Sequence, residues 1–288
     1  MSRVHIITDS AAKIDPNVAK RLDITVVPLK IRIEGKTYQH GDDIDSEKLL
    51  LRMSQEHIRP RIVGPTAEEL RRIYAQVTRH TDQVISLHSS ANLSLVHREA
   101  RKAAGEFLGR CDIAVVDSET LSLGLGILAE EAARLAAADV SLSEIVRRIR
   151  GMIRHIYIDL ITETLDYLEH SRLISPAQAI LGTMLNIKPF LALEEGQIIP
   201  MEKVRSPERA IDKLAEFAGE FTKIDRIAIL QSTPYPTDDT SALRERLESV
   251  APGHEFPILL YGPVLACHIG PNALGLIVYE KATREVYI

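Results

Sequence analysis

The first half of the chain alternates short apolar runs with amphipathic stretches, and this alternation limits the folds open to it. Four runs rich in β-branched residues end in turn or capping residues, at positions 4–7, 24–27, 84–87 and 113–116. Helical patterns lie among them, at positions 67–78, 93–108 and 122–138. Strands that alternate with helices form a parallel sheet that is covered on both faces. We therefore predict an α/β fold with an N-terminal parallel doubly wound sheet and helices on both faces.

The second half follows a different pattern, which predicts a mixed α/β sheet with hairpins. Glu195-Gly196 separates two apolar runs and is typical of a hairpin turn. We expect helices at 162–170, 176–185, 207–221 and 239–250, and strands at 188–193, 198–204, 227–230, 256–260, 264–268 and 273–279. Ser141 begins a capping pattern for a helix that runs through about Ile156. We place the domain boundary there, with an N-terminal α/β domain at 1–155 and a C-terminal α/β domain at 156–288.

Composition excludes several classes of protein. The chain has 288 residues, of which 45% are hydrophobic and 5% aromatic, so aliphatic side chains must form the core. The net charge is -5 with both signs mixed, which argues against binding to nucleic acid. No apolar run approaches the length of a membrane span, and the first residues show no signal-peptide pattern. We expect a cytoplasmic protein without a membrane span, in which Cys111 and Cys267 are buried thiols rather than a disulfide.

Polar residues follow three of the predicted parallel strands. They are Thr8-Asp9-Ser10, His88-Ser89-Ser90 and Asp117-Ser118. Ligands of open parallel sheets bind outside the carboxyl ends of the strands, where these residues should converge. The alternative is helix capping, because Ser and Asp favour N-cap positions.

The catalytic motifs that we tested are absent. No G-x-G-x-x-G pattern follows the first strand, and close helix packing explains Gly124-Leu125-Gly126 better than a dinucleotide site. The sequence has no Walker loop and no G-x-S-x-G elbow, and His88 and His97 fit no metal motif. We predict no catalytic residues, no metal site and no cofactor.

His268 is an isolated imidazole between an apolar run and the turn Gly270-Pro271-Asn272. We expect it at a strand end, where a fixed bend lets it donate a hydrogen bond to an anion. The alternative is a half-buried histidine bonded to nearby backbone. The basic residues Arg172, Lys188, Lys203 and Arg205 form either a solvated face or a surface that meets an anion or a partner.

Eight segments in order resemble the DegV family of fatty-acid-binding proteins, which includes the acyl-carrying subunit of bacterial fatty acid kinase. These segments are Ile7-Thr8-Asp9-Ser10, Gly41-Asp42-Asp43-Ile44, Pro65-Thr66-Ala67-Glu68-Glu69-Leu70, Leu93-Ser94, Asp117-Ser118-Glu119-Thr120-Leu121-Ser122-Leu123-Gly124, Leu165-Asp166-Tyr167-Leu168, the run from Ile174-Ser175 to Lys188-Pro189, and His268-Ile269-Gly270-Pro271. Each is weak alone, but the ordered set is specific and spans nearly the whole chain.

The resemblance implies a long-chain fatty acid in a tunnel between two domains, with its carboxylate held by Ser94 and His268. It also implies that the chain presents this carboxylate to a separate ATP-dependent kinase subunit. Ile62 occupies the position of a third family residue, a threonine, and the nearby hydroxyls of Thr66 and Ser90 are candidate substitutes. Arg172 corresponds to a family arginine and is a candidate for kinase docking or phosphoryl transfer.

An alternative function remains open at this point. A phosphotransferase or hydrolase of the same doubly wound type would use strand-end Asp and Ser residues on a small anionic substrate, with Asp9 and Asp117 binding metal or phosphate.

Overall fold

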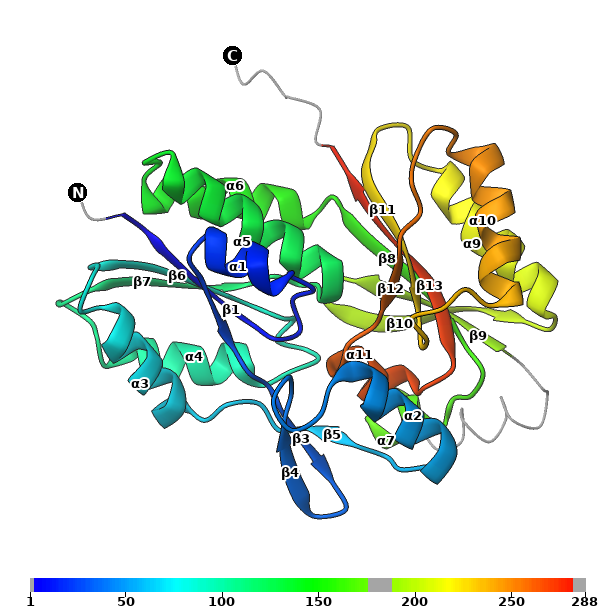
Figure 1. The fold of residues 1–288 in the computed structure, drawn as a ribbon, viewed down its shortest axis with the longest axis horizontal. Helices are drawn as coiled ribbons and strands as arrows, with labels where there is room; N and C mark the ends of the chain where they lie inside the picture. Colours follow the sequence, from blue (N-terminus) through cyan, green and yellow to red (C-terminus); the bar gives the residue numbers. More distant parts are fainter. Residues whose placement is uncertain (1–2, 176–187, 282–288) are drawn as a thin grey trace. The chain divides into compact units, whose positions relative to one another are not determined.

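The computed structural model describes residues 3–175 and 188–281, and its described residues form two compact units (Figure 1). The first unit contains the residues up to Ile44, together with Ile62–Arg154 and Glu195–Gln197. The second contains Asp45–Arg61, His155–Glu194 and the residues from Ile198 onward. The predicted division into residues 1–155 and 156–288 stays a prediction.

The first unit is built on a four-stranded sheet in the order β2-β1-β6-β7. Its strands are β1 (His5–Asp9), β2 (Ile24–Val27), β6 (Gln83–His88) and β7 (Asp112–Asp117). All three neighbouring pairs run parallel, which confirms the predicted parallel sheet.

Helices cover both faces of this sheet. They are α1 (Pro16–Arg21), α3 (Ala67–Val77), α4 (Val96–Gly105), α5 (Ser122–Ala137) and α6 (Leu142–Ile153). Figure 1 shows α3 and α4 on one face and α5 and α6 on the other. On the first face, Tyr74 and Leu70 of α3 pack against Ala100 of α4 and Ile7 of β1. Because both faces are covered, the strands read as nearly continuous apolar runs.

A hairpin extends from the first unit. β3 (Lys30–Ile33) and β4 (Lys36–Gln39) pair antiparallel, and β5 (Arg61–Ile62) completes a three-stranded sheet in the order β4-β3-β5. Glu34 and Gly35 form its turn with φ of 48° and 83°. Positive φ at both turn residues matches the twist of the flanking strands.

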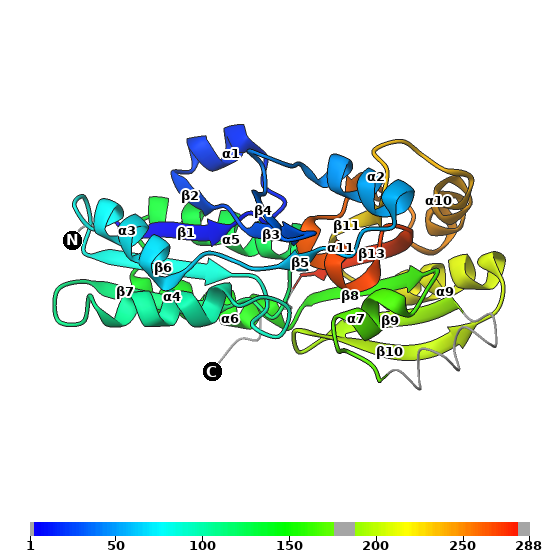
Figure 2. The ribbon, with the colours of Figure 1, turned by 90° about the horizontal axis from the view of Figure 1, so that it is seen from below.

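The second unit is built on a six-stranded sheet in the order β10-β9-β8-β13-β11-β12. Its strands are β8 (Ile156–Thr162), β9 (Lys188–Glu194), β10 (Gln197–Val204), β11 (Ile224–Gln231), β12 (Ile258–Leu260) and β13 (Ala273–Glu280). β8 pairs antiparallel with β9 and β13, whereas β11 and β12 run parallel, so the sheet is mixed as predicted. Figure 2 shows β9 and β10 side by side at its edge.

Five helices belong to the described part of the second unit. They are α2 (Ser46–Glu56), α7 (Asp166–His170), α9 (Pro207–Gly219), α10 (Asp238–Val250) and α11 (Pro263–Ile269). Leu214 of α9 and Leu243 of α10 pack in one core with Ile229 and Leu276 of the sheet. Among the described residues, no helix combines the length and the apolarity that crossing a membrane requires.

Three local predictions are wrong, and each has a physical reason. The helix predicted through Ile156 ends at Ile153, and the strand β8 that follows was not predicted. The strand predicted at 264–268 is the helix α11, which Pro263 starts from its first position. The helix predicted at 162–170 is only α7, because Thr162 is the last residue of β8.

Two further predicted helices remain, one with a different start and one outside the described residues. The helix predicted from Leu93 starts at Val96, because Ser94 accepts a hydrogen bond from the Val96 amide in a turn before it. The helix predicted at 176–185, and most of the DegV-like segment from Ile174 to Pro189, lie outside the described residues.

Candidate functional site

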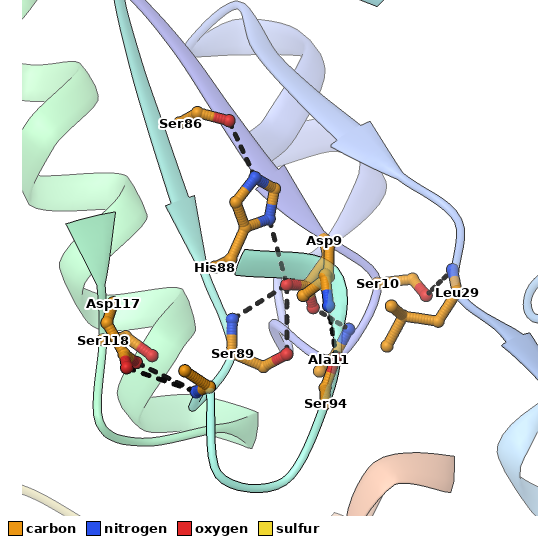
Figure 3. Close-up of polar contacts among 12 residues, drawn as sticks. Asp9, Ser10, Ala11, Leu29, Ser86, His88, Ser89, Ser94, Asp117 and Ser118 are labelled. Carbon is orange, nitrogen blue, oxygen red and sulfur yellow. Dashed lines mark hydrogen bonds and ion pairs between the residues drawn. The ribbon is translucent and has the colours of Figure 1, made fainter. Parts of the chain in front are cut away.

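The polar strand ends of the first unit converge, as predicted. Asp9, His88 and Asp117 are the last residues of three neighbouring strands, and His88 is directly opposite Asp117 in the β6–β7 register. Figure 3 shows their side chains at one edge of the sheet, beside the loop that carries Ser94. The parallel sheet therefore gathers carboxylate, imidazole and hydroxyl groups in one place.

The carboxylate of Asp9 is fully buried and surrounded by donors. Its Oδ1 accepts from the Ala11 amide at 3.0 Å. Its Oδ2 accepts from the Ser89 amide at 2.8 Å, from Ser89 Oγ at 3.1 Å and from His88 Nδ1 at 3.2 Å. Buried charge is tolerated when it is hydrogen-bonded in this way. Asp9 therefore joins the turns after two strands, and its acceptor atoms already have partners.

A chain of buried hydrogen bonds leads from Asp9 into the core. His88 Nε2 lies 2.7 Å from Ser86 Oγ, which lies 2.8 Å from the Tyr74 hydroxyl. Burial raises the pKa of Tyr74 to about 12, so Tyr74 keeps its proton at neutral pH. The bonds are consistent with a directed series in which Tyr74 donates to Ser86, Ser86 donates to His88 Nε2, and His88 Nδ1 donates to Asp9.

The Ser86-His88-Asp9 order is that of a hydrolase triad, but its setting is different. Ser86, His88 and Asp9 have no exposed surface, so Ser86 has no access to a substrate. This series of hydrogen bonds therefore fixes the end of β6 and does not activate a nucleophile. This role of His88 was not predicted from the sequence, although an imidazole at the end of an apolar strand, with an aspartate at a neighbouring strand end, was a usable signal.

The loop after β6 carries the predicted ligand residue Ser94. Its side chain is 5% exposed, and its Oγ accepts from the Val96 amide at 3.2 Å. Its backbone amide donates to the Ser90 carbonyl at 3.0 Å. A hydroxyl carries one proton and two acceptor positions. The proton of Ser94 has no acceptor among the described residues, so the hydroxyl can donate to a ligand.

Asp117 caps the same loop from the third strand. Its two carboxylate oxygens accept from the Ala91 amide at 3.2 and 3.3 Å, and Oδ1 also accepts from the Glu119 amide at 3.0 Å. Asp9 and Asp117 thus bind loop amides that follow the strands, but neither is a helix N-cap, because Asp15, Leu95 and Leu121 are the N-caps of α1, α4 and α5. In the described part of the chain, no group of three His, Cys, Asp or Glu residues is arranged to hold a metal ion.

His268, in the second unit, lies in the last turn of α11 and is half-buried. Gly270 follows it with φ of 86°, a conformation that glycine adopts readily. The bend predicted after His268 is therefore present, although it ends a helix rather than a strand.

Carbonyl groups around His268 are held by side chains from elsewhere in this unit. Ser171 Oγ donates to the Cys267 carbonyl at 3.0 Å, and Thr162 Oγ1 donates to the Ile269 carbonyl at 2.7 Å. The Tyr261 hydroxyl donates to the Gly270 carbonyl at 2.8 Å. These bonds replace the partners that a helix C-terminus lacks. The backbone on both sides of His268 is therefore fixed by side chains.

Tyr167 and Cys267 complete the surroundings of this bend. A Cβ atom on Gly270 would lie 2.6 Å from the Tyr167 ring, so the ring packs directly against the backbone. Cys267 is 3% exposed, and its burial raises the pKa of the thiol. Both cysteines are free, so no disulfide joins Cys111 and Cys267.

The remaining predicted site residues lie on separate elements. Thr66 is exposed and caps α3, where its Oγ1 donates to Glu69 Oε2 at 2.9 Å. Ser90 is fully buried and donates to the Gly196 carbonyl at 2.6 Å. Arg172 is exposed beyond α7 with φ of 61°, and Ile62 is half-buried in β5. The accessory roles of Thr66 and Ser90 stay predictions, and they would require these hydroxyls to exchange their present partners for a ligand.

Two cavities with mixed polar and apolar linings lie among the described residues of the second unit. One, of about 240 Å³, is lined by residues that include Lys188, Gln231 and Thr237. The other, of about 270 Å³, is lined by residues that include Arg59 and Tyr167. His268 lines neither cavity, although Thr162, Tyr167 and Ile269 of its surroundings line the second.

Comparison with known proteins identifies similar chains along the whole length. A family model described as "Uncharacterised protein, DegV family" matches residues 3–281. A DegV domain-containing protein of Deinococcus radiodurans is 33% identical over 280 residues, which cover 95% of this chain and 97% of the relative.

Solved structures give the same result. A structure that reports fatty acid binding of a DegV family protein from Thermus thermophilus is 30% identical, with a TM-score of 0.82, and the match covers 97% of this chain and 100% of that one. A fatty acid binding DegV family protein from Streptococcus agalactiae is 26% identical, with a TM-score of 0.86, and the match covers 98% and 100%.

Proposed function

Because the chain belongs to the DegV family, we propose that it binds a long-chain fatty acid and presents the carboxylate to a separate ATP-dependent fatty acid kinase subunit. The observation that carries the proposal is the similarity, over nearly the full length of both chains, to the fatty-acid-binding protein of Thermus thermophilus at 30% identity. The ligand is thus an acyl chain with an ionised head group.

Ser94 supplies one donor for the head group in this proposal. Its Oγ already accepts from the Val96 amide, so its own proton is left to point toward an acceptor. A buried carboxylate needs such donors, because removing it from water without hydrogen bonds is costly.

His268 supplies the second donor. The fixed carbonyls of Cys267, Ile269 and Gly270 hold its backbone, so little conformational freedom is lost when the imidazole binds an anion. A hydrogen bond to a charged group such as the carboxylate contributes about 1.5–3 kcal/mol, more than one between neutral groups.

The acyl tail supplies most of the binding free energy. A tail of roughly fifteen methylenes gains on the order of 10 kcal/mol on burial, at about 0.8 kcal/mol for each methylene. Lost freedom of the tail and of the whole ligand offsets much of this gain. The aliphatic, tryptophan-free composition suits an apolar binding site of this kind.

The chain acts as a carrier in this proposal, and the kinase subunit supplies the nucleotide site. The exposed Arg172 is the candidate contact for that subunit. The alternative phosphotransferase or hydrolase function requires free strand-end carboxylates. Asp9 and Asp117 instead accept hydrogen bonds from neighbouring backbone amides, so no observation favours it.

Calorimetric titration of the delipidated protein tests the proposal with two ligands, palmitate and methyl palmitate. We expect palmitate to bind at one molecule per chain and the ester, which has no ionised head group, to bind at least about tenfold more weakly, the factor that corresponds to 1.4 kcal/mol. Equal affinities would exclude recognition of the carboxylate, and no binding of either ligand would exclude the carrier function.

A further inference from the structure

Two hairpin turns of the chain have the same sequence and nearly the same backbone. Glu34-Gly35 joins β3 to β4 with φ of 48° and 83°, and Glu195-Gly196 joins β9 to β10 with φ of 48° and 76°. Their surroundings differ. A Cβ atom on Gly35 would meet nothing within 4 Å, whereas one on Gly196 would lie 2.6 Å from Ser90 Oγ and 3.2 Å from Glu119 Cα.

The loop that carries Ser94 binds both carbonyls of the second turn. Ser90 Oγ donates to the Gly196 carbonyl at 2.6 Å, and Asn92 Nδ2 donates to the Glu195 carbonyl at 3.3 Å. A two-residue hairpin closes by its own strand pairing and needs no such support. The division of the chain into two compact units agrees with these bonds. Glu195–Gln197 is grouped with the first unit, although β9 belongs to the sheet of the second.

Ser90 transmits the position of this turn to Ser94. Its amide donates to the Thr120 carbonyl at 2.9 Å, and its carbonyl accepts from the amides of Leu93 and Ser94 at 3.1 and 3.0 Å. With its hydroxyl on Gly196, every polar group of Ser90 is bonded, and the residue is fully buried. A shift of the turn would therefore move the backbone that sets the Ser94 hydroxyl.

We propose that the Glu195-Gly196 turn, acting through Ser90, is a positioning element for the head-group donor Ser94. Gly196 is required because a side chain there would displace Ser90, and Ser90 is a positioning residue rather than a ligand contact. This inference rests on the proposed function in so far as Ser94 holds the carboxylate of the acyl chain.

The matched variants Gly196→Ala and Gly35→Ala test the inference. Both place alanine at a positive φ in a Glu-Gly turn, so both carry the same backbone strain, but only Gly196→Ala meets Ser90. We expect hydrogen exchange at the Leu93 and Ser94 amides to accelerate in Gly196→Ala only. Palmitate affinity should fall about fivefold in Gly196→Ala, which is the effect of losing about one hydrogen bond. In Gly35→Ala the affinity should change less than about twofold.

Ser90→Ala is a second test, and this substitution adds no atoms to the buried site. It tests the inference even if Gly196→Ala does not fold. It should weaken palmitate binding by a similar factor. The double variant Ser90→Ala/Gly196→Ala should bind palmitate no more weakly than the single variant with the lower affinity, because both changes break the same bond between Ser90 and the Gly196 carbonyl.

Equal amide exchange in the two glycine variants would overturn the inference, as would unchanged palmitate affinity in Gly196→Ala and Ser90→Ala. A parent protein that binds no palmitate would contradict the proposed function instead. The exchange rates of Leu93 and Ser94 would then still decide whether the turn positions this loop.

Discussion

Hydroxyl groups near the strand ends differ in whether their protons are donated to an acceptor within the protein. Those of Ser90 and Thr66 donate to acceptors within the first unit, to the Gly196 carbonyl and to Glu69. Ser94 accepts a hydrogen bond but uses its own proton on no described residue. This difference separates the candidate ligand residue from hydroxyls with a structural bond, and residue types alone do not reveal it.

His268→Ala should weaken palmitate binding by at least about 1 kcal/mol, because the ionised head group loses one hydrogen-bond donor. Calorimetry on the delipidated variant measures the effect. His80→Ala, an exposed histidine beyond α3, is the control that should bind as the parent does. Matching affinities in the two variants would remove His268 from the site.

Ile62→Thr should strengthen palmitate binding by about threefold, since it returns a hydroxyl donor to the position of the family threonine. Ile62→Val is the matched control, because valine has the shape of threonine without the hydroxyl. The same titration measures both variants. A threonine variant that binds no more tightly than the valine variant would show that position 62 does not reach the head group.

Asp159 of β8 makes stability depend on pH. Burial, with the charges of Glu220 and Glu194, raises its pKa to about 7 in the folded protein. The folded state therefore binds one more proton than the unfolded state between about pH 4, the ordinary pKa of an aspartate, and pH 7, and the free energy of unfolding falls as pH rises through this window.

Asp159→Asn removes this pH dependence. The variant should have a higher melting temperature than the parent at pH 8, where Asp159 is ionised, and little difference at pH 4. Asp225→Asn, at an exposed position of β11, is the control. Thermal unfolding at the two pH values measures the effect, and an equal gain at both values would contradict the assignment.

Turns and caps are the elements that the sequence predicts best. Ser141 caps α6 as predicted, and Pro16 starts α1 and Thr66 caps α3 by the same local rules, because each acts through its own neighbours. β8 and α11 are harder, since a seven-residue apolar stretch fits either a strand or a short helix.

The bend that ends α11 depends on Gly270. Alanine there must adopt φ near 86° with ψ near -174°, a region that is nearly exclusive to glycine, and its Cβ would lie 2.6 Å from the Tyr167 ring. Gly270→Ala should lower the free energy of unfolding by about 3 kcal/mol, measured by urea denaturation.

Gly253→Ala is the control for this prediction. Gly253 has φ of 83°, but a Cβ there would meet nothing within 4 Å. The control should lose about 1 kcal/mol, the cost of backbone strain alone. Equal losses in the two variants would mean that packing of Tyr167 against the bend contributes nothing.

At the scale of the whole molecule, pairing between strands that are distant in sequence is what the sequence does not predict. The parallel sheet follows from strands that alternate with helices, so the sequence predicts it correctly. In the second unit, β8 pairs with β13, and Thr162 meets Ala273 across more than a hundred residues of chain. The bond from Thr162 to the Ile269 carbonyl arises from that pairing, and no local pattern encodes it.

The resemblance to the DegV family supplied Ser94 and His268 as ligand residues, because they lie in its ordered segments. Their structural supports, Ser90 with Gly196 in one unit and Thr162 with Tyr261 in the other, came only from the structure. Each support joins residues that are distant in sequence or lie outside those segments.

Native mass spectrometry of the protein purified from bacterial cells, without added lipid, tests the central claim most directly. We predict a main species heavier than the polypeptide by the mass of one fatty acid, which is released on denaturation and identified after extraction. Protein that carries no fatty acid, and that stays unliganded after incubation with palmitate and with oleate, would contradict the account.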